Sequence, residues 1–291
     1  MRSKLSVWVA LCAVVCLVPV AVLAKHASTT KKKTNQTPYY LALGDSLSRG
    51  AQPNAQGNTA PTSQGYANDL YATEKREIKG LKLKQLGCMG ESTTTMLNGG
   101  VCRYSAGSQL NAAINFIAKH KIAFITLDIG ANDIDGCVSS RTGFDTTCLT
   151  NGASSISTNV PTIVKDLRNA AGSNVEIAAM TYYDPFLANY LHGSTGREEA
   201  RVSVQLGKEV NDTLSSDFTT QHFRVADVAT AFDVYTPFTS TVTVHGLGTI
   251  PVAVAETCKL TWMCKAPPVG PNIHATTAGY KEIAKVFAAA L

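Results

Sequence analysis

Three side chains that can take part in covalent catalysis occupy well-defined places in this chain. Ser46 lies in a Gly-Asp-Ser-Leu sequence at 44–47, at the end of a short apolar run. Asn132 lies in a Gly-Ala-Asn-Asp sequence after another apolar run, and His274 precedes the C-terminal segment. A serine hydroxyl becomes a nucleophile when a base such as histidine takes its proton. An amide can donate to the negative charge that then develops. The alternative roles are structural, because Ser46 can cap a helix and Asn132 can form an Asx turn.

A glycine-containing loop offers a further donor. Gly90 opens a Gly-Glu-Ser-Thr sequence just past the apolar segment 81–87. Because glycine has no side chain, its backbone N–H can approach a substrate oxygen closely. Gly87 satisfies the same local criterion, so these residues alone leave both candidates open.

The elements that must position these residues alternate along the chain. Apolar runs at 39–44, 81–87, 122–130, 175–183 and 223–228 predict strands, and the segments 66–75, 108–120, 156–171, 198–218 and 277–291 predict helices. This alternation predicts a mostly parallel sheet covered by helices on both faces. Ser46, Gly90 and Asn132 each follow a different strand, so we expect them at the carboxyl edge of the sheet, where open α/β sheets bind ligands.

The four segments together resemble the GDSL, or SGNH, family of serine ester hydrolases. The first block is at 44–47, the second surrounds Gly90, the third is at 130–133 and the last surrounds His274, where Thr, Gly and Tyr follow the histidine. The resemblance spans residues 39 to about 290 and selects Gly90 over Gly87. It implies a flavodoxin-like three-layer α/β/α sandwich with a mostly parallel five-stranded sheet. It also implies acyl transfer through Ser46, with the N–H groups of Ser46 and Gly90 and the Asn132 amide as oxyanion donors.

One position departs from the family pattern. The family usually has an aspartate three residues before the histidine, and here that residue is Pro271. A catalytic imidazole needs an acceptor for its second nitrogen. We therefore expect a Ser46–His274 dyad whose ring is held by the backbone carbonyl of Pro271. The rival acceptor is the side-chain oxygen of Asn272.

The N-terminus has the pattern of an export signal. Residues 1–24 combine a basic start, an uncharged apolar stretch and a small-residue end at Val-Leu-Ala, which predicts a cleaved signal peptide. The alternative is an uncleaved membrane anchor, because the stretch approaches the length of a span. Residues 25–38 are polar and predict a linker, and residues 39–291 form the predicted hydrolase domain. We therefore expect a secreted protein, most similar to the disulfide-containing actinobacterial esterases and lipases.

Six cysteines remain after the signal, and an even number in an exported chain predicts disulfides, although fifteen pairings are possible. Pairing of sequence neighbours closes the shortest loops and gives Cys88–Cys102, Cys137–Cys148 and Cys258–Cys264. The chain has no Cys-x-x-Cys zinc pattern, and the spacing of Asp128, Asp133 and Asp135 does not fit an EF-hand. We therefore expect no metal and no cofactor.

Charge and composition limit the classes of molecule that this chain is expected to bind. Residues 1–33 hold six basic residues and no acid, so the formal charge of +5 leaves 20 basic and 21 acidic residues in the remainder. That remainder lacks the excess of basic residues that is typical of nucleic-acid binding. We expect a monomer without a membrane span after signal cleavage, acting on acyl lipids or short-chain esters. The alternatives are a carbohydrate acetyl esterase and an inactive binding module on the same fold. Segment 237–251 predicts a hairpin or a loop bordering an acyl site.

Overall fold

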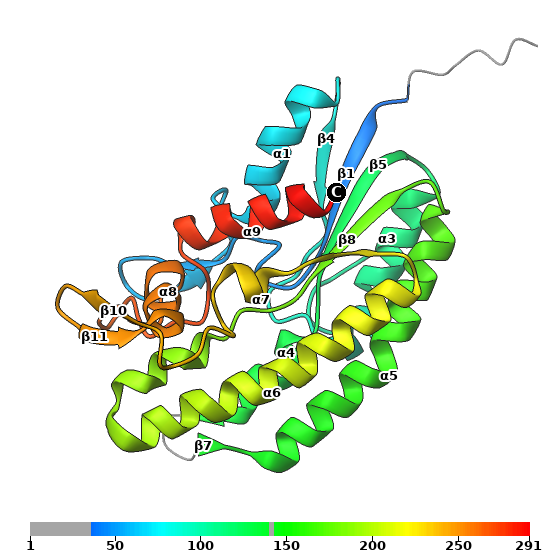
Figure 1. Ribbon diagram of the computed structural model, residues 1–291. Coiled ribbons are helices and arrows are strands. Elements are labelled where there is room, and N and C mark those ends of the chain that lie inside the picture. The colour runs from blue at the N-terminus through cyan, green and yellow to red at the C-terminus, as the bar shows by residue number, and fades with distance from the viewer. Residues whose placement is uncertain (1–35, 140–142) are drawn as a thin grey trace, which may run out of the picture. The chain divides into compact units, whose positions relative to one another are not determined.

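Five parallel strands form the central sheet, in the order β4-β1-β5-β8-β9 (Figure 1). Counted along the chain, this is the order 2-1-3-4-5 of flavodoxin-like folds. Each strand lies within, or overlaps, an apolar run that the sequence predicts, so the predicted fold class is confirmed. The strands are β1 (Pro38–Gly44), β4 (Lys82–Gln85), β5 (Lys121–Asp128), β8 (Glu176–Met180) and β9 (Arg224–Ala226).

This computed structural model describes residues 36–139 and 143–291. Chain contacts group Gln36–Leu291 into one unit. The expected signal peptide at 1–24 and most of the expected linker at 25–38 lie outside the described residues. Within the described ranges, no helix is both long and apolar enough to cross a membrane.

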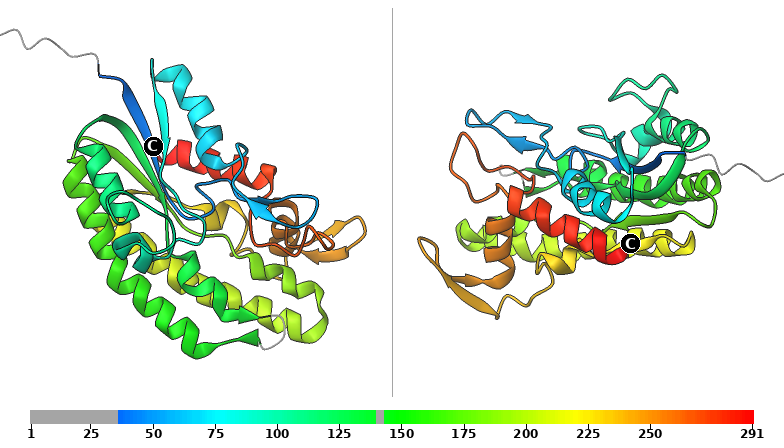
Figure 2. Two further views of the ribbon diagram at one scale, coloured as in Figure 1. Left: turned by 180° about the vertical axis from the view of Figure 1, so that it is seen from behind. Right: turned by 90° about the horizontal axis from the view of Figure 1, so that it is seen from above.

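Helices cover both faces of the sheet, as Figure 2 shows. Helices α1 (Tyr66–Glu77) and α9 (Thr277–Ala290) lie on one face and contribute to one buried cluster. Helices α3 (Gln109–Ile117), α5 (Thr146–Ala171) and the C-terminal half of α6 (Gly193–Thr220) pack on the other face. The five helices that the sequence predicts therefore all form, and the sheet is buried between two layers.

Strand β1 shows why its sequence is continuously apolar. Successive side chains of a strand point to opposite faces of the sheet. Tyr40 and Ala42 accordingly belong to the cluster under α1 and α9, whereas Leu41 and Leu43 belong to the opposite one. All four are fully buried. Both faces of this strand are covered, as the apolar run predicts.

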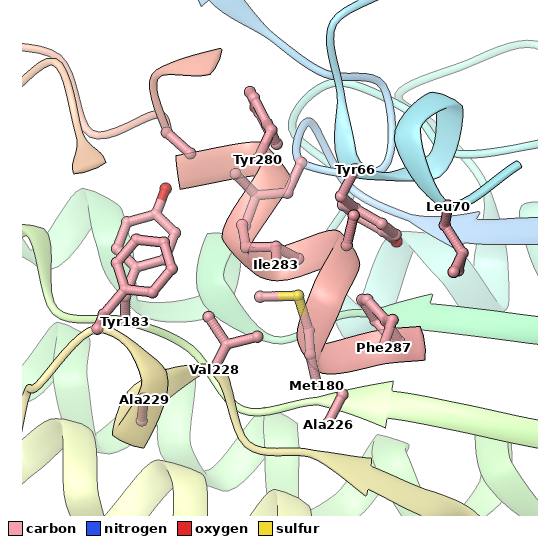
Figure 3. Packing of buried hydrophobic residues seen from close by; sticks show 14 of the residues in the cluster. Tyr66, Leu70, Met180, Tyr183, Ala226, Val228, Ala229, Tyr280, Ile283 and Phe287 are labelled. Carbon is pink, nitrogen blue, oxygen red and sulfur yellow. The ribbon is translucent and has the colours of Figure 1, made fainter. Parts of the chain in front are cut away.

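The C-terminal helix fixes the position of the segment that carries His274. Ile283 and Phe287 are fully buried, and the Phe287 ring stacks on that of Tyr66 with a centroid distance of 4.8 Å (Figure 3). Thr276 caps the start of α9 by accepting a hydrogen bond from the backbone N–H of Gly279. The histidine therefore stands three residues before Thr277, the first residue of a firmly packed helix.

Several elements differ from the sequence-based expectation. Helix α5 begins at Thr146 rather than at 156, because Asp145 caps it with an acceptor for the Cys148 N–H at 3.0 Å. Helices α2 (Thr93–Asn98) and α8 (Val252–Leu260) were not predicted. Segment 237–251 forms the β10–β11 hairpin (Thr241–Val244 and Gly248–Pro251), one of the two predicted alternatives. The remaining short elements are β2 (Gln52–Pro53), β3 (Thr59–Ala60), α4 (Ala131–Ile134), η1 (Asp135–Cys137), β6 (Val138–Ser139), β7 (Gly143–Phe144), η2 (Pro185–Leu191) and α7 (Val228–Ala231).

Candidate active site

Ser46 and His274, which are 228 residues apart in sequence, meet at the carboxyl edge of the sheet. The hydroxyl of Ser46 lies 2.9 Å from Nε2 of His274. Nδ1 of the same ring lies 2.8 Å from Oδ1 of Asn272. An amide oxygen only accepts, so Nδ1 carries the proton and Nε2 is left to accept from the serine. The arrangement is that of a nucleophile, a base and a group that orients the base.

The acceptor for the ring is Asn272, and the expectation that the carbonyl of Pro271 would hold it is wrong. Pro271 is exposed, whereas the Asn272 side chain turns inward with the histidine. Its Oδ1 accepts from both Nδ1 and the backbone N–H of His274, the latter at 3.0 Å. Its Nδ2 donates to the hydroxyl of Thr59 on strand β3 at 2.8 Å. Both ends of the amide are thus fixed, which gives Asn272 one orientation.

Burial controls the ionisation of the base. Desolvation lowers the pKa of His274 to about 4, because a buried imidazolium loses hydration that a neutral ring does not need. The neighbouring Asn272 carries no charge that would oppose this shift. At neutral pH the ring is therefore uncharged and able to accept a proton from Ser46.

The turn that carries Ser46 is anchored to the neighbouring strand. Gly44 ends β1 with a φ of +131°, and a Cβ there would lie 2.1 Å from the backbone oxygen of Asp128. Only glycine allows β1 and β5 to approach so closely at this point. A carboxylate oxygen of Asp128 then accepts from the backbone N–H groups of Asp45 and Ser48, at 3.0 and 3.3 Å. Ser46 lies between these two anchored residues.

Two buried carboxyls lie beneath this turn. Burial raises the pKa of Asp128 well above its usual range, and the nearby Asp45 raises it further. Hydroxyls serve both groups: Tyr66 donates to Asp128, and Tyr182 donates to Asp45 at 2.9 Å. Burial and their mutual repulsion disfavour ionisation of both carboxyls together, which raises the pKa of each. Asp128 therefore positions the Ser46 turn, a role that its sequence context did not reveal.

The two other expected donors lie on loops that are bound to each other. One N–H of the Asn132 amide donates to the carbonyl of Glu91 at 3.0 Å, which leaves its second N–H for another acceptor. The carboxylate of Asp133 accepts from the backbone N–H and the hydroxyl of Thr93, at 2.8 and 2.7 Å. The loop after β4 and the loop after β5 therefore form one unit. Asn132 lies at its edge, in the same pocket as Ser46.

Gly90 is placed by this unit but does not line the pocket in the described structure. It is exposed, with a φ of +78° that favours glycine. Within residues 36–139 and 143–291, no acceptor binds the backbone N–H of Gly90 or that of Ser46. Packing explains the other candidate glycine, Gly87, because a Cβ there would lie 1.8 Å from the Ser48 hydroxyl.

A buried glutamine, which no sequence motif indicated, connects strand β1 to the Gly90 loop. Gln109, at the start of α3, is completely buried. Its amide accepts from the Gly44 N–H at 2.6 Å and donates to the Gly44 carbonyl at 2.9 Å. The same Nε2 donates to the carboxylate of Glu91 at 2.8 Å. Gln109 thereby sets the distance between the Ser46 turn and the Gly90 loop.

The three expected disulfides are all present, and each supports one of the loops at this edge. Cys88–Cys102 lies beside Gly90. Cys137–Cys148 joins the segment after Asn132 to the start of α5. Cys258–Cys264 encloses Trp262, whose backbone accepts from the Asn272 N–H and donates to the His274 carbonyl, at 3.3 and 3.0 Å. The bridges thus stabilise the surroundings of the candidate catalytic residues.

Comparison with known proteins identifies the family to which the chain belongs. A family model described as GDSL-like Lipase/Acylhydrolase matches residues 40–287. The chain belongs to the GDSL-like lipase/acylhydrolase family. It is therefore a carboxylic ester hydrolase. No curated protein sequence matches the chain.

Solved structures with the same fold share little sequence with this GDSL-like chain. An extracellular lipase from Streptomyces rimosus is 18% identical and has a TM-score of 0.56, with 87% of this chain and 100% of that chain covered. Phospholipase A1 from Streptomyces albidoflavus NA297 is 16% identical, with a TM-score of 0.56 and coverage of 88% and 100%. LAE5, an enzyme from the metagenome of Lake Arreo in Spain, is 17% identical, with a TM-score of 0.52 and coverage of 88% and 95%. At these identities the similarity establishes the fold.

An apolar pocket opens beside the serine of this GDSL-like hydrolase. It contains about 890 Å³ of empty space, its open mouth included. Most of its wall is apolar, and residues from α4, β6, β7, α5, η2 and α6 contribute. Burial raises the pKa of Asp135 to about 8 and that of Asp184 to about 6. Asp135 in the wall is therefore mostly uncharged at neutral pH. No cluster of metal-ligating side chains occurs in the part of the chain that the structure describes.

Proposed function

We propose that this chain is a secreted serine esterase or lipase that cleaves carboxylic esters through an acyl-Ser46 intermediate. The observation that carries the proposal is the chain of hydrogen bonds from Ser46 Oγ to His274 and from His274 to Asn272, at 2.9 and 2.8 Å. It supports His274 as the base and Asn272 as the group that fixes the ring. The family membership supports the ester as the bond that is cleaved.

In the acylation step, Ser46 Oγ attacks the carbonyl carbon of the ester while its proton passes to His274 Nε2. The carbonyl electrons move to the oxygen, which becomes an oxyanion. We assign its stabilisation to the N–H groups of Ser46 and Gly90 and to the second N–H of Asn132. The intermediate then collapses, the bond to the alcohol oxygen breaks, and His274 returns its proton to that oxygen. The products are a free alcohol and acyl-Ser46.

Deacylation repeats these steps with water. His274 takes a proton from a water molecule as its oxygen attacks the acyl carbon. The second tetrahedral intermediate releases the carboxylic acid and restores the Ser46 hydroxyl. During both steps the imidazolium is oriented by the uncharged Asn272 rather than by a carboxylate. Burial disfavours the imidazolium, and this increases its tendency to give its proton to the leaving group.

The apolar pocket supports an acyl chain as the bound part of the substrate, which favours acyl lipids or short-chain esters over acetylated sugars. The disulfides and the sequence of residues 1–24 support export. The extracellular lipase from Streptomyces rimosus has the same fold and is consistent with this location.

The test combines turnover with active-site labelling. The wild type should hydrolyse p-nitrophenyl butyrate without added metal, and a fluorophosphonate should label the peptide that contains Ser46. Ser46→Ala should lose both signals and keep its circular dichroism spectrum, whereas Ser240→Ala, at an exposed serine, should keep both. Retained turnover in Ser46→Ala would place the nucleophile elsewhere. A wild type that neither turns over nor labels would be an inactive binding module.

A further inference from the structure

Four glycines lie inside the long helices of the described chain, beyond the first helical residue, and three of them are required by packing. A Cβ at Gly152 of α5, Gly196 of α6 or Gly279 of α9 would lie 2.2, 2.0 or 2.1 Å from a backbone oxygen of another segment. Any side chain there would displace a neighbouring element. The fourth glycine, Gly207 of α6, has no atom within 4 Å of the same built Cβ.

Gly207 therefore lacks the packing reason that explains the other three. Glycine in a helix interior destabilises the helix relative to alanine, because the unfolded chain has more conformational freedom. Gly207 also has no need for an unusual backbone angle, since its φ is not positive. It does line the pocket that contains Ser46 and His274. What the missing side chain provides at this position is open space in the pocket.

A second depression, between α5 and α6, adjoins the pocket that Gly207 lines. Four apolar residues line both pockets: Ile134, Leu149, Leu206 and Val210. Two of them stand on α6, on either side of Gly207 in sequence. The second pocket contains about 910 Å³, its open mouth included. Figure 1 shows α5 and α6 side by side.

We propose that the acyl chain of the substrate extends from Ser46 across Gly207 towards the groove between α5 and α6, and that Gly207 determines which chain lengths the enzyme accepts. This inference rests on the proposed function and names its substrate class: esters of medium-chain and long-chain fatty acids. Gly207 acts as a specificity residue, because its missing side chain leaves room for methylene groups beyond those nearest the carbonyl.

Burial of each methylene contributes about 0.8 kcal/mol, which corresponds to about a fourfold gain in kcat/KM. The wild type should therefore gain with each added carbon from butyrate to octanoate, and laurate should remain a better substrate than butyrate. A side chain at position 207 that fills the space should remove this gain. The short acyl groups, which end before position 207, should be affected least.

The experiment measures kcat/KM for p-nitrophenyl butyrate, octanoate and laurate with the full chain as it is secreted. Gly207→Leu should lower the ratio of laurate to butyrate kcat/KM by at least about 30-fold, the equivalent of two to three buried methylenes. Gly207→Ala should lower this ratio less. Because alanine suits the helix and has space here, it should also raise the Tm by about 2–4 °C. Gln205→Leu, which adds the same side chain on the exposed face of α6, is the matched control and should leave the ratio unchanged.

The outcomes separate this inference from the proposed function. If the wild type hydrolyses none of the three esters, the proposed function fails. If it hydrolyses them but both Gly207 variants keep the wild-type ratio, Gly207 does not set chain length and the inference is wrong. A Tm decrease in Gly207→Ala would contradict the open space and overturn the inference as well. A selective loss on laurate that grows from alanine to leucine would confirm it.

Discussion

The two sides of the candidate active site are built in different ways. The Ser46 side rests on buried and strongly hydrogen-bonded groups: Asp128 holds the turn, and Gln109 joins Gly44 to Glu91. The His274 side is a partly exposed loop whose orienting group is the uncharged Asn272, held by Thr59. One side is a rigid platform formed by the sheet. The other depends on contacts between loops far apart in sequence.

The two sides therefore differ in how much their geometry can vary. Donors for an oxyanion must stay within a few tenths of an ångström of their positions, so the platform has little freedom. A ring needs only an acceptor at one nitrogen, and the amide oxygen of Asn272 supplies it because the amide N–H is held by Thr59. Both sides depend on His274, which accepts the proton of Ser46.

Replacement of the base should have the largest effect. His274→Ala removes the group that takes the Ser46 proton, so kcat should fall by about 10⁴–10⁶-fold, as for other serine enzymes without their base. Steady-state hydrolysis of p-nitrophenyl butyrate measures this loss. A variant within tenfold of the wild type would show that a different residue acts as the base.

On the platform, Asn132→Ala should lower kcat by about 10²–10³-fold, the usual cost of one oxyanion donor. The KM should change little, because the ground-state carbonyl gains less from this donor than the oxyanion does. Kinetics over a range of substrate concentrations separate the two parameters. An increase in KM alone would make Asn132 a binding residue.

The stability of the protein should also depend on Gln109, which links Gly44 to Glu91 on the Ser46 side. Gln109→Leu leaves the N–H and carbonyl of Gly44 and the carboxylate of Glu91 without this partner, and should lower the free energy of unfolding by about 3 kcal/mol. Urea unfolding followed by circular dichroism measures the change. Gln205→Leu, the same replacement at an exposed site, should change stability little. Equal stabilities of the two variants would show that the bridge does not hold the platform.

On the histidine side, Asn272→Ala should have a smaller effect. It removes one hydrogen bond to a ring that is charged during the reaction, so kcat/KM should fall by about 10- to 150-fold. A loss as large as that of His274→Ala would show that Asn272 is as necessary for catalysis as His274. Unchanged kinetics would mean that another acceptor, such as the Pro271 carbonyl, holds the ring.

The sequence predicts the platform better than the histidine side, and the reason is physical. The five strands follow from local apolar runs, and strand ends must meet at one edge, so Ser46 and Asn132 are brought together by topology alone. The choice between Pro271 and Asn272 depends on which side chain points inward. That is decided by Thr59, a contact across 213 residues. Gln109 and Asp128 escaped prediction because most of their hydrogen bonds are to backbone groups of segments far away in sequence, which leave no motif.

The pH dependence of kcat/KM in the wild type and in Asn272→Asp tests the central claim, that His274 is a base oriented by an uncharged group. The pH profile of kcat/KM reports the pKa of the free enzyme. Burial lowers the pKa of His274 to about 4, so wild-type activity should persist well below pH 6 and be lost as the pH falls through about 4. A carboxylate at 272 favours the imidazolium and should raise this acid limb by about 1–3 pH units. An acid limb near neutral pH in the wild type, unmoved in the Asn272→Asp variant, would contradict the account.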